Sequence, residues 1–217
     1  MIDIRPPPPP PAWLAPFLAK CHRRRVPAKT DITQAGEPAS SLLYIVSGSV
    51  TVMVENDEGR EIVLGYLNKG EFVGEMAMFL AQPTRSMRVR TRTACDLAEI
   101  SYAKLELLFH GELRDHLHDI LFAIGRQLSE RLLRTSRKVG SLAFLDVTGR
   151  IAATLLDLCR QPDAMTHPDG MQIRVTRQEL GRIVGCSREM AGRVLKALEE
   201  QGLIHARGKT IVVYGAR

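Results

Sequence analysis

Residues Thr176–Val194 read T-R-Q-E-L-G-R-I-V-G-C-S-R-E-M-A-G-R-V, and this stretch predicts two short helices joined by a tight turn. Thr176 and Glu179 have the spacing of a capping box, which begins the first helix. Gly185 supplies a left-handed residue where that helix ends, and Ser187 caps the next one. The apolar residues recur every three or four positions, as expected for helices with one buried face: Leu180, Ile183, Val184, Met190, Ala191, Val194, Leu195 and Leu198.

Three charged residues, Arg188, Glu189 and Arg193, are left on the outer face of the second helix. This arrangement is typical of a helix-turn-helix whose second helix enters the major groove of DNA. The alternative is an ordinary corner of a helix bundle with a solvated charged face. The local charge favours DNA, because the segment from Arg174 to Arg217 holds nine Lys or Arg and four Asp or Glu. That segment therefore carries five of the six net positive charges of the chain, a concentrated field that attracts phosphate.

Length and composition are those of a globular protein with one large domain or two smaller ones. The chain has 217 residues, of which 45% are hydrophobic, so either arrangement can bury a core. It contains no apolar run long enough for a signal peptide, or for a membrane span of roughly 18 residues. We therefore expect a cytoplasmic protein without a membrane partner.

The cysteines and histidines predict neither a metal site nor a catalytic centre. The four cysteines stand far apart and form no C-x-x-C pair, so we expect idle thiols in a reducing compartment. His110, His116 and His118 cluster at the start of the predicted long helix, but their spacings do not place metal ligands on one helical face. No arrangement typical of an enzyme active site is present, and we expect a binding protein.

The N-terminal part begins with a proline run and continues as β-structure. Pro6–Pro11 are six consecutive prolines, which predict an extended polyproline II rod, either a mobile tail or a ligand for an aromatic groove. Trp13–His22 predicts a short helix. From Val26 to about Ser101, short alternating runs are divided by glycines about every 11 residues, which predicts a compact β-roll or sandwich.

Within this predicted β-domain, the stretch G-E-F-V-G-E-M-A-M-F contains a candidate phosphate site. Gly74 permits a close backbone approach, and the amides of a short helical turn after it can bind a phosphate. Arg85 supplies a planar charged fork for phosphate oxygens, and Ser86 adds a hydroxyl. Glu75 suits a ribose hydroxyl, since a carboxylate accepts hydrogen bonds and repels a second phosphate. The pattern is not specific on its own, because G-E and R-S dipeptides are common.

From about Leu117 the apolar pattern has a helical period. The stripe consists of Leu117, Ile120, Leu121, Ile124, Leu128, Leu132 and Leu133. A helix of this length predicts a dimerisation helix, and packing against its own domain is the alternative. Gly140 predicts a break or hinge. A helix at Ile151–Cys159 and a turn-rich segment at 161–171 then precede the helix-turn-helix, and a two-stranded hairpin turning at Arg207–Gly208 makes it winged.

The order of these parts resembles the catabolite activator, or cyclic-AMP receptor, family of the Crp/Fnr superfamily. The resemblance covers nearly everything from about Phe17 to Arg217, and its most specific stretches are L-A-F-L-D-V-T-G-R-I, Q-P-D-A-M-T-H-P-D-G-M-Q-I, I-V-G-C-S-R-E and G-K-T-I-V-V-Y-G. It implies an α+β fold. The implied segments are a proline-rich tail (1–12), a β-roll cyclic-nucleotide-binding domain (13–116), a dimerisation helix with its hinge (117–144) and a winged helix-turn-helix domain (145–217).

The resemblance also assigns ligand and DNA contacts residue by residue. It implies that the nucleotide is held by Gly74, Glu75, Arg85, Ser86, Arg131, Thr135 and Ser136, the last from the partner subunit. The bases are read by Arg188, Glu189 and Arg193. Arginines suit the paired acceptors of guanine and a carboxylate suits the amino group of cytosine, so a half-site like T-G-T-G-A is implied. The implied phosphate contacts are Thr176, Arg177, Gln178, Ser187, Arg207 and Lys209.

Three further sets follow from the same resemblance. The hinge between the domains is Phe144, Leu145 and Asp146. A surface loop that contacts RNA polymerase in the family is matched by Thr166, His167, Pro168, Asp169 and Gly170. A second such surface is matched in part by His22 and Lys104.

The implied effector is cyclic AMP, with cyclic di-GMP as the alternative and no metal. The segment H-G-E-L-R-D-H-L-H is about five residues longer than in the enterobacterial activator, as in relatives that respond to cyclic di-GMP. Arg85 and Ser86 keep the form of the cyclic-AMP responders, which favours cyclic AMP. We therefore expect a homodimeric transcription regulator. A cyclic-nucleotide module that acts through protein partners is an alternative of another class, against which the outward charged trio argues.

Overall fold

The computed structural model describes residues 9–216, which form two compact units. The first unit contains the chain up to Val50 together with Leu67–Arg131, and the second contains Thr51–Tyr66 and the chain from Leu132 onward. The predicted polyproline segment falls partly outside the described residues, since only Pro9–Pro11 are described, and these are exposed.

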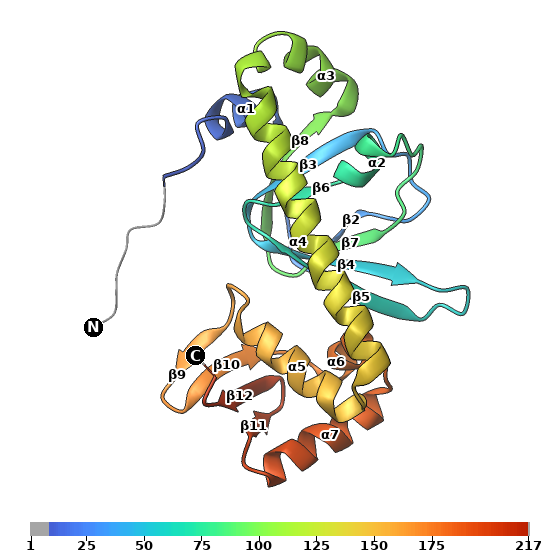
Figure 1. The fold of residues 1–217 in the computed structure, drawn as a ribbon, viewed down its shortest axis with the longest axis vertical. Helices are drawn as coiled ribbons and strands as arrows, with labels where there is room; N and C mark the ends of the chain where they lie inside the picture. Colours follow the sequence, from blue (N-terminus) through green and yellow to red (C-terminus); the bar gives the residue numbers. More distant parts are fainter. Residues whose placement is uncertain (1–8, 217) are drawn as a thin grey trace. The chain divides into compact units, whose positions relative to one another are not determined.

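The first unit is built from antiparallel strands and short helices, as the alternating sequence predicts (Figure 1). One sheet has the strand order β1-β8-β3-β6 and another has the order β2-β7-β4-β5. The elements of this unit are α1 (Leu14–Lys20), β1 (His22–Val26), β2 (Asp31–Thr33), β3 (Ser41–Ser47), β6 (Phe72–Val73), α2 (Glu75–Phe79), β7 (Arg88–Thr91), β8 (Cys95–Ser101), α3 (Tyr102–His110) and the 3-10 helix η1 (Arg114–His116). Strands β4 (Ser49–Glu55) and β5 (Glu61–Asn68) and helix α4 (Leu117–Phe144) belong to both units.

Four aromatic side chains form the centre of the first unit's core. Trp13 and Phe17 of the N-terminal helix meet Tyr44 of β3 and Phe72 of β6, with ring centroids 5.0 to 6.1 Å apart. Most of these pairs meet edge to face, the geometry that the ring quadrupoles favour. The short helix predicted at the N-terminus is therefore confirmed, and the core fixes Phe72 two residues before the candidate phosphate site.

The residues of the apolar stripe predicted on the long helix include some that are buried and some that are exposed. Ile120 and Ile124 are fully buried in the core of the first unit, so the expectation that they face a second subunit is wrong. They lie on the side of α4 that covers the aromatic core. For these two residues the alternative is correct, since they pack against the helix's own domain.

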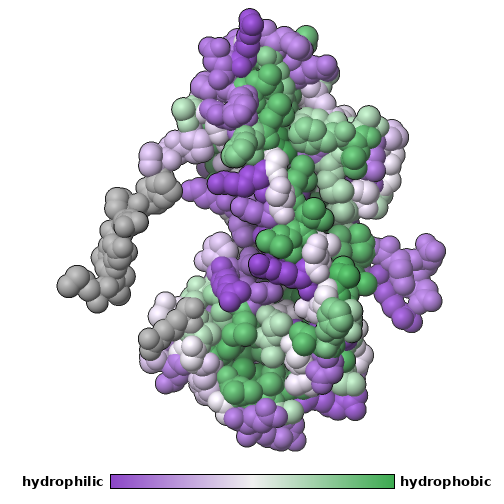
Figure 2. Space-filling view, viewed as in Figure 1, coloured by the Kyte–Doolittle hydropathy of each residue, from purple (hydrophilic) through white to green (hydrophobic). Residues whose placement is uncertain are grey.

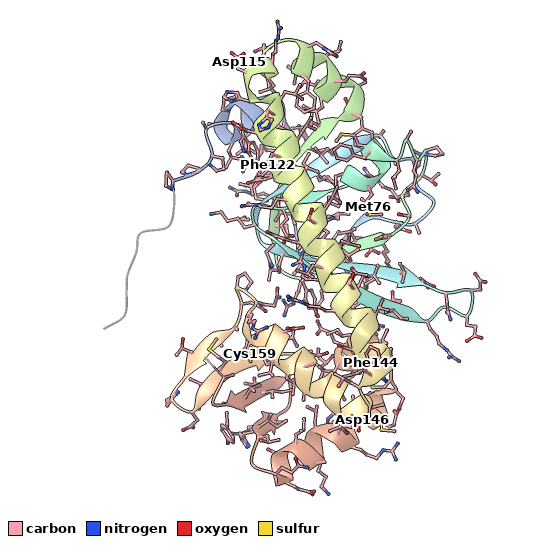
Figure 3. The ribbon with its side chains drawn as sticks, in the orientation of Figure 1. Met76, Asp115, Phe122, Phe144, Asp146 and Cys159 are labelled. Atoms are coloured by element: carbon pink, nitrogen blue, oxygen red, sulfur yellow. The ribbon has the colours of Figure 1, made fainter. Side chains whose placement is uncertain are left out.

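Other apolar residues of α4 are exposed. Leu132 and Leu133 of the predicted stripe are exposed, and so is Phe122, which the stripe did not include and which is 68% exposed (Figure 3). Apolar surface follows the course of α4 in Figure 2. No helix within residues 9–216 is both long and apolar enough to cross a membrane.

The break expected at Gly140 is absent, because α4 runs through this residue and ends at Phe144. A single glycine inside a helix costs about 1 kcal/mol relative to alanine, which a long helix tolerates. The end of α4 is followed by Asp146 in an extended conformation, and the Asp146 carboxylate caps the next helix by accepting from Gly149 N at 2.7 Å.

The second unit carries the predicted helix-turn-helix, which is confirmed, and a larger sheet than the sequence predicts (Figure 1). Its elements from α4 onward are α5 (Val147–Cys159), β9 (Met165–His167), β10 (Gly170–Arg174), α6 (Arg177–Val184), α7 (Arg188–Glu200), β11 (Ile204–Arg207) and β12 (Thr210–Tyr214). The expected two-stranded wing is part of a four-stranded sheet with the order β11-β12-β10-β9. The segment expected to be turn-rich forms β9 and the start of β10, because β10 pairs with β12 over five residues.

The β4–β5 hairpin contributes to the core of the second unit. Met53, Val63 and Tyr66 are buried in the same cluster as the apolar faces of α5, α6 and α7. Tyr66 Oη also donates to the carboxylate of Glu179 on α6 at 2.9 Å. The capping box is therefore confirmed on the Thr176 side, where Oγ1 accepts from Glu179 N at 3.1 Å, while the Glu179 side chain binds a tyrosine.

Candidate nucleotide cradle and DNA-reading helix

The candidate phosphate site begins at a left-handed glycine. Gly74 has a φ of +97° and directly precedes α2, which starts at Glu75. A Cβ at position 74 would lie 2.2 Å from Arg85 Nη1 and 2.8 Å from Ser41 O, so both the backbone conformation and the space demand glycine. The structure thus brings together Gly74, Glu75 and Arg85, as the sequence predicts.

Arg85 is buried and held in place by groups that the sequence did not indicate. Its Nη2 donates to Ser41 O at 2.7 Å, and its Nη1 donates to Tyr102 Oη at 3.2 Å. Tyr102 Oη in turn donates to Gly74 O at 2.7 Å. Ser86, the next residue, is exposed. Tyr102 therefore links the glycine turn to the arginine, and its distance in the sequence from both explains why no motif revealed it.

Glu75 is the most deeply buried charged residue of the cradle. Its side chain is 1% exposed, and Oε1 forms an ion pair with Arg131 of α4, which also donates to Phe72 O. Burial raises the pKa of the Glu75 carboxyl, and the neighbouring Arg131 opposes that rise. The other oxygen, Oε2, is buried without a hydrogen-bond partner among the described residues. This free acceptor fits a hydroxyl of a bound sugar, and the nearby Arg85 fits a phosphate.

The remaining predicted ligand and hinge residues lie on α4 and directly after it. Thr135 and Ser136 are exposed side chains of α4. Phe144 and Asp146, both labelled in Figure 3, stand at the end of α4 and before α5, and Phe144 is 88% exposed. Arg150 of α5 donates to the carbonyl of Leu145 at 3.1 Å. The predicted hinge is thus a break between two helices, at which one carbonyl and one carboxylate are fixed by hydrogen bonds.

The helix-turn-helix has the local geometry that its sequence predicts. Gly185 adopts φ 75° and ψ 46°, the left-handed conformation that ends α6. Ser187 Oγ accepts from Met190 N at 3.1 Å and so caps α7. The sequence alone indicated no role for Gly181. The structure shows that this position requires glycine, because a Cβ there would lie 2.6 Å from Cys186 O. The turn between α6 and α7 therefore packs directly on α6, and a glycine in mid-helix was the available signal.

The outer face of α7 presents the predicted DNA contacts together. Arg188, Glu189 and Arg193 are exposed, and they line one hollow with residues of α6 and α7 that include Arg177 and Lys196. The other predicted phosphate contacts are mostly exposed, namely Gln178, Ser187, Arg207 and Lys209, with Thr176 half-buried. A charged helix face beside exposed basic residues is suited to a DNA groove flanked by phosphates.

The two predicted polymerase surfaces are in separate units. The first surface spans the end of β9 at Thr166 and His167, the turn at Pro168 and Asp169, and the first residue of β10, Gly170; all but His167 and Gly170 are exposed. His22 and Lys104 are exposed on β1 and α3, and Lys104 Nζ donates to Lys20 O at 2.7 Å. Within residues 9–216, no group of three His, Cys, Asp or Glu is placed to hold a metal ion, and all four cysteines are free thiols.

A buried Glu–Arg cradle in a β-roll and a charged helix in a winged helix-turn-helix together define a class of protein, the DNA-binding regulator with a small-molecule domain. Residues 23–111 match the cyclic nucleotide-binding domain family, and residues 149–214 match the Crp-like helix-turn-helix domain family. The chain belongs to the Crp-like transcription regulators, which combine these two domains.

Full-length relatives support this assignment. The chain is 58% identical over 204 residues to the cAMP-activated global transcriptional regulator Vfr of Pseudomonas aeruginosa, covering 93% of each chain. It is 59% identical over 201 residues to the CRP-like protein Clp of Xanthomonas euvesicatoria, covering 93% of this chain and 87% of that one. The structure of the c-di-GMP responsive global regulator CLP of Xanthomonas campestris matches with a TM-score of 0.89 at 58% identity, covering 94% of this chain and 98% of the other.

Gly74 offers a direct test of the cradle geometry. We predict that Gly74→Ala abolishes nucleotide binding, because the new Cβ must displace Arg85 and strain the backbone. Gly70→Ala is the matched control. Gly70 has a similar φ of +93°, but a Cβ there would meet nothing closer than Tyr44 Oη at 3.9 Å. Isothermal titration calorimetry measures both variants, and equal nucleotide affinity for the two would contradict the assigned cradle.

Proposed function

We propose that this chain is a homodimeric transcription regulator in which cyclic AMP bound to the first unit controls DNA binding by the second. The observation that carries the proposal is the cradle around Gly74, in which the buried Glu75 keeps one free carboxylate oxygen and the buried Arg85 lies against the glycine turn. A cyclic mononucleotide offers one phosphate and one free ribose hydroxyl, which this pair of groups matches. The nucleotide is then an effector and undergoes no reaction.

The cradle favours a single phosphate. Arg85 is the cation beside Gly74, whereas Glu75 repels a second anion. Cyclic AMP therefore fits better than cyclic di-GMP, which carries two phosphates. Cyclic di-GMP remains the second candidate because a similar structure is that of a c-di-GMP responsive regulator. The relative from Pseudomonas aeruginosa is cAMP-activated, and we propose the same sign here, so that nucleotide strengthens DNA binding.

The proposed ligand set extends along α4. Gly74, Glu75, Arg85 and Ser86 hold the phosphate and ribose, and Arg131, Thr135 and Ser136 approach the purine on grounds of the family resemblance. The pairing of Arg131 with Glu75 gives Arg131 a second task, because it neutralises the carboxylate that holds the ribose. Ser136 is proposed to come from the partner subunit.

The exposed apolar residues of α4 support the proposed homodimer. Phe122, Leu132, Leu133 and Val139 of α4 are all more than half exposed. The buried residues of the helix, by contrast, are Ile120, Ile124 and Gln127, in its first half. Large exposed apolar side chains at helical spacing are stabilised when a second helix covers them. A symmetric pair of α4 helices covers both sets at once, and it presents two recognition helices to successive major grooves about 34 Å apart.

The proposed DNA contacts divide by function. Arg188, Glu189 and Arg193 read base edges in a T-G-T-G-A half-site, while Thr176, Arg177, Gln178, Ser187, Arg207 and Lys209 hold phosphates. Phe144–Asp146 is the proposed hinge, and the β9–β10 turn with His22 and Lys104 is proposed to contact RNA polymerase. A regulator of this kind acts in the cytoplasm, where the chromosome of a bacterium lies.

Calorimetry with cyclic AMP and cyclic di-GMP tests the ligand assignment. We predict that the full-length protein binds cyclic AMP and that Arg85→Ala and Glu75→Ala each lose at least tenfold in affinity. Each change removes hydrogen bonds to a charged group, worth about 1.5–3 kcal/mol. Arg126→Ala, on the exposed side of α4, should bind normally. Normal binding of cyclic AMP by both cradle variants would disprove the assigned site. Binding of cyclic di-GMP but not of cyclic AMP would identify cyclic di-GMP as the effector.

Fluorescence anisotropy on a T-G-T-G-A palindrome tests the DNA assignment. Arg188→Ala should weaken binding about 5- to 150-fold, since one bidentate base contact is worth about 1–3 kcal/mol. Lys209→Ala should weaken binding to all sequences and lower the salt dependence by about one ion. Glu200→Ala, near the far end of the same helix, serves as the control. The proposed DNA-binding function would be refuted if the wild-type protein failed to bind this DNA at moderate salt, with or without nucleotide. That result would favour a cyclic-nucleotide module that acts through protein partners.

A further inference from the structure

Gln127 is a polar residue on the buried side of α4. Within this helix the buried side chains are Ile120, Ile124 and Gln127, and Gln127 is 6% exposed. The two isoleucines join the aromatic core of the first unit. A buried amide is costly unless its polar atoms are hydrogen-bonded, and an apolar residue would fill the same space without that cost. The amide therefore has a task other than packing.

Both polar atoms of the Gln127 side chain bind the backbone of one residue, Phe72. Gln127 Oε1 accepts from Phe72 N at 2.6 Å, and Gln127 Nε2 donates to Phe72 O at 3.0 Å. This is the pair of bonds that a hydrogen-bonded residue of an adjacent antiparallel strand makes. Strand β6 is the last strand of its sheet and pairs with β3 on its other side. Gln127 therefore replaces the missing neighbour at the open edge of β6.

The strand that Gln127 holds leads directly into the cradle. Gly74 and Glu75 follow Phe72 by two and three residues. Arg131, one helical turn beyond Gln127 on the same side of α4, also donates to Phe72 O and pairs with Glu75. The two α4 residues thus hold the entry and the carboxylate of the cradle from one helix face.

The two contacts differ in how they respond to a ligand. Arg131 forms an ion pair with Glu75. A nucleotide that binds the Glu75 carboxylate therefore changes the strength of this ion pair. The Gln127 amide is neutral, and both of its polar atoms bind backbone, so its bonds do not depend on the charge of the ligand. A displacement of β6 on ligand binding must therefore move the backbone of α4 with it or break both bonds.

We propose that Gln127 is the positioning residue that keeps the nucleotide cradle in register with α4 and so transmits ligand binding to this helix. The inference rests on the proposed cyclic-nucleotide function of the cradle. Gln127 itself touches no nucleotide in this scheme. It acts through Phe72, whose backbone it fixes, and through the short connection from Phe72 to Gly74 and Glu75.

The test compares Gln127→Leu with the wild-type, full-length protein, using cyclic AMP as the probe. Leucine keeps most of the side-chain volume and removes both bonds. Calorimetry should show about a tenfold loss of nucleotide affinity, which corresponds to about 1.4 kcal/mol. Anisotropy should show that nucleotide changes DNA affinity by a smaller factor than in the wild type, while DNA affinity without nucleotide is unchanged. Ile124→Val, which removes a methylene from the same buried face, controls for lost packing and should keep wild-type nucleotide affinity.

Gln127→Glu supplies a readout that a packing role would not produce. At neutral pH the ionised carboxylate faces Phe72 O, and affinity for cyclic AMP should fall as in Gln127→Leu. A protonated carboxyl has one donor and one acceptor, like the amide, and burial favours the protonated form. Affinity should therefore recover towards the wild-type value as the pH is lowered from about 7 to about 5, whereas Gln127→Leu and Ile124→Val should show no such gain over the wild type.

The outcomes separate this inference from the proposed function. Wild-type affinity and a full DNA response in Gln127→Leu would overturn the role of Gln127 and leave the cradle intact. If Gln127→Leu folds poorly, the pH profile of Gln127→Glu decides, and a flat profile overturns the inference. If the wild-type protein binds neither cyclic AMP nor cyclic di-GMP, the cradle assignment fails, and the positioning role fails with it.

Discussion

A carboxylate that is only 1% exposed stays charged in a protein core only when a cation or several donors stand beside it. Glu75 has such a cation in Arg131, and Arg131 is supplied by α4. The same helix binds the backbone of Phe72 through Gln127, so the strand that enters the cradle is tied to α4 at two positions. The cradle therefore depends on α4 for its charge balance and its register. A change in the interactions of Glu75 therefore acts directly on Arg131 of this helix.

The helix that completes the cradle also carries the exposed apolar residues on which the proposed dimer depends. Ile120 and Ile124 are buried in the first unit, whereas Phe122, Leu132 and Leu133 are exposed. The proposed ligand binding and the proposed subunit association thus share one element, which continues without interruption through Gly140 to Phe144. Beyond α4, the chain from Asp146 onward forms most of the core of the second unit, which is made from α5, α6, α7 and the four-stranded sheet. The β4–β5 hairpin supplies Met53, Val63 and Tyr66 to that core.

Local signals in the sequence predicted the elements well. The caps at Thr176 and Ser187, the left-handed glycines at 74 and 185, and the strand alternation between Val26 and Ser101 each depend on a few neighbouring residues, and the structure has them. Pairing and packing between residues that are far apart in the sequence could not be predicted from such local signals. The segment at 165–174 becomes strands because β12 lies beside it, and the stripe on α4 divides according to which residues meet the aromatic core. The supporting groups of the cradle, Ser41, Tyr102 and Gln127, are scattered along the chain and share no motif.

The central claim is that nucleotide in the cradle and DNA on α7 are linked, and a reciprocal linkage measurement tests it most directly. DNA affinity is measured with and without saturating cyclic AMP, and cyclic AMP affinity is measured with and without saturating DNA. Coupling between two sites is thermodynamically reciprocal and typically amounts to about 5- to 150-fold. We predict that each ligand strengthens the binding of the other by the same factor within this range. If both ligands bind and neither affects the other, the account of a ligand-controlled DNA reader is contradicted.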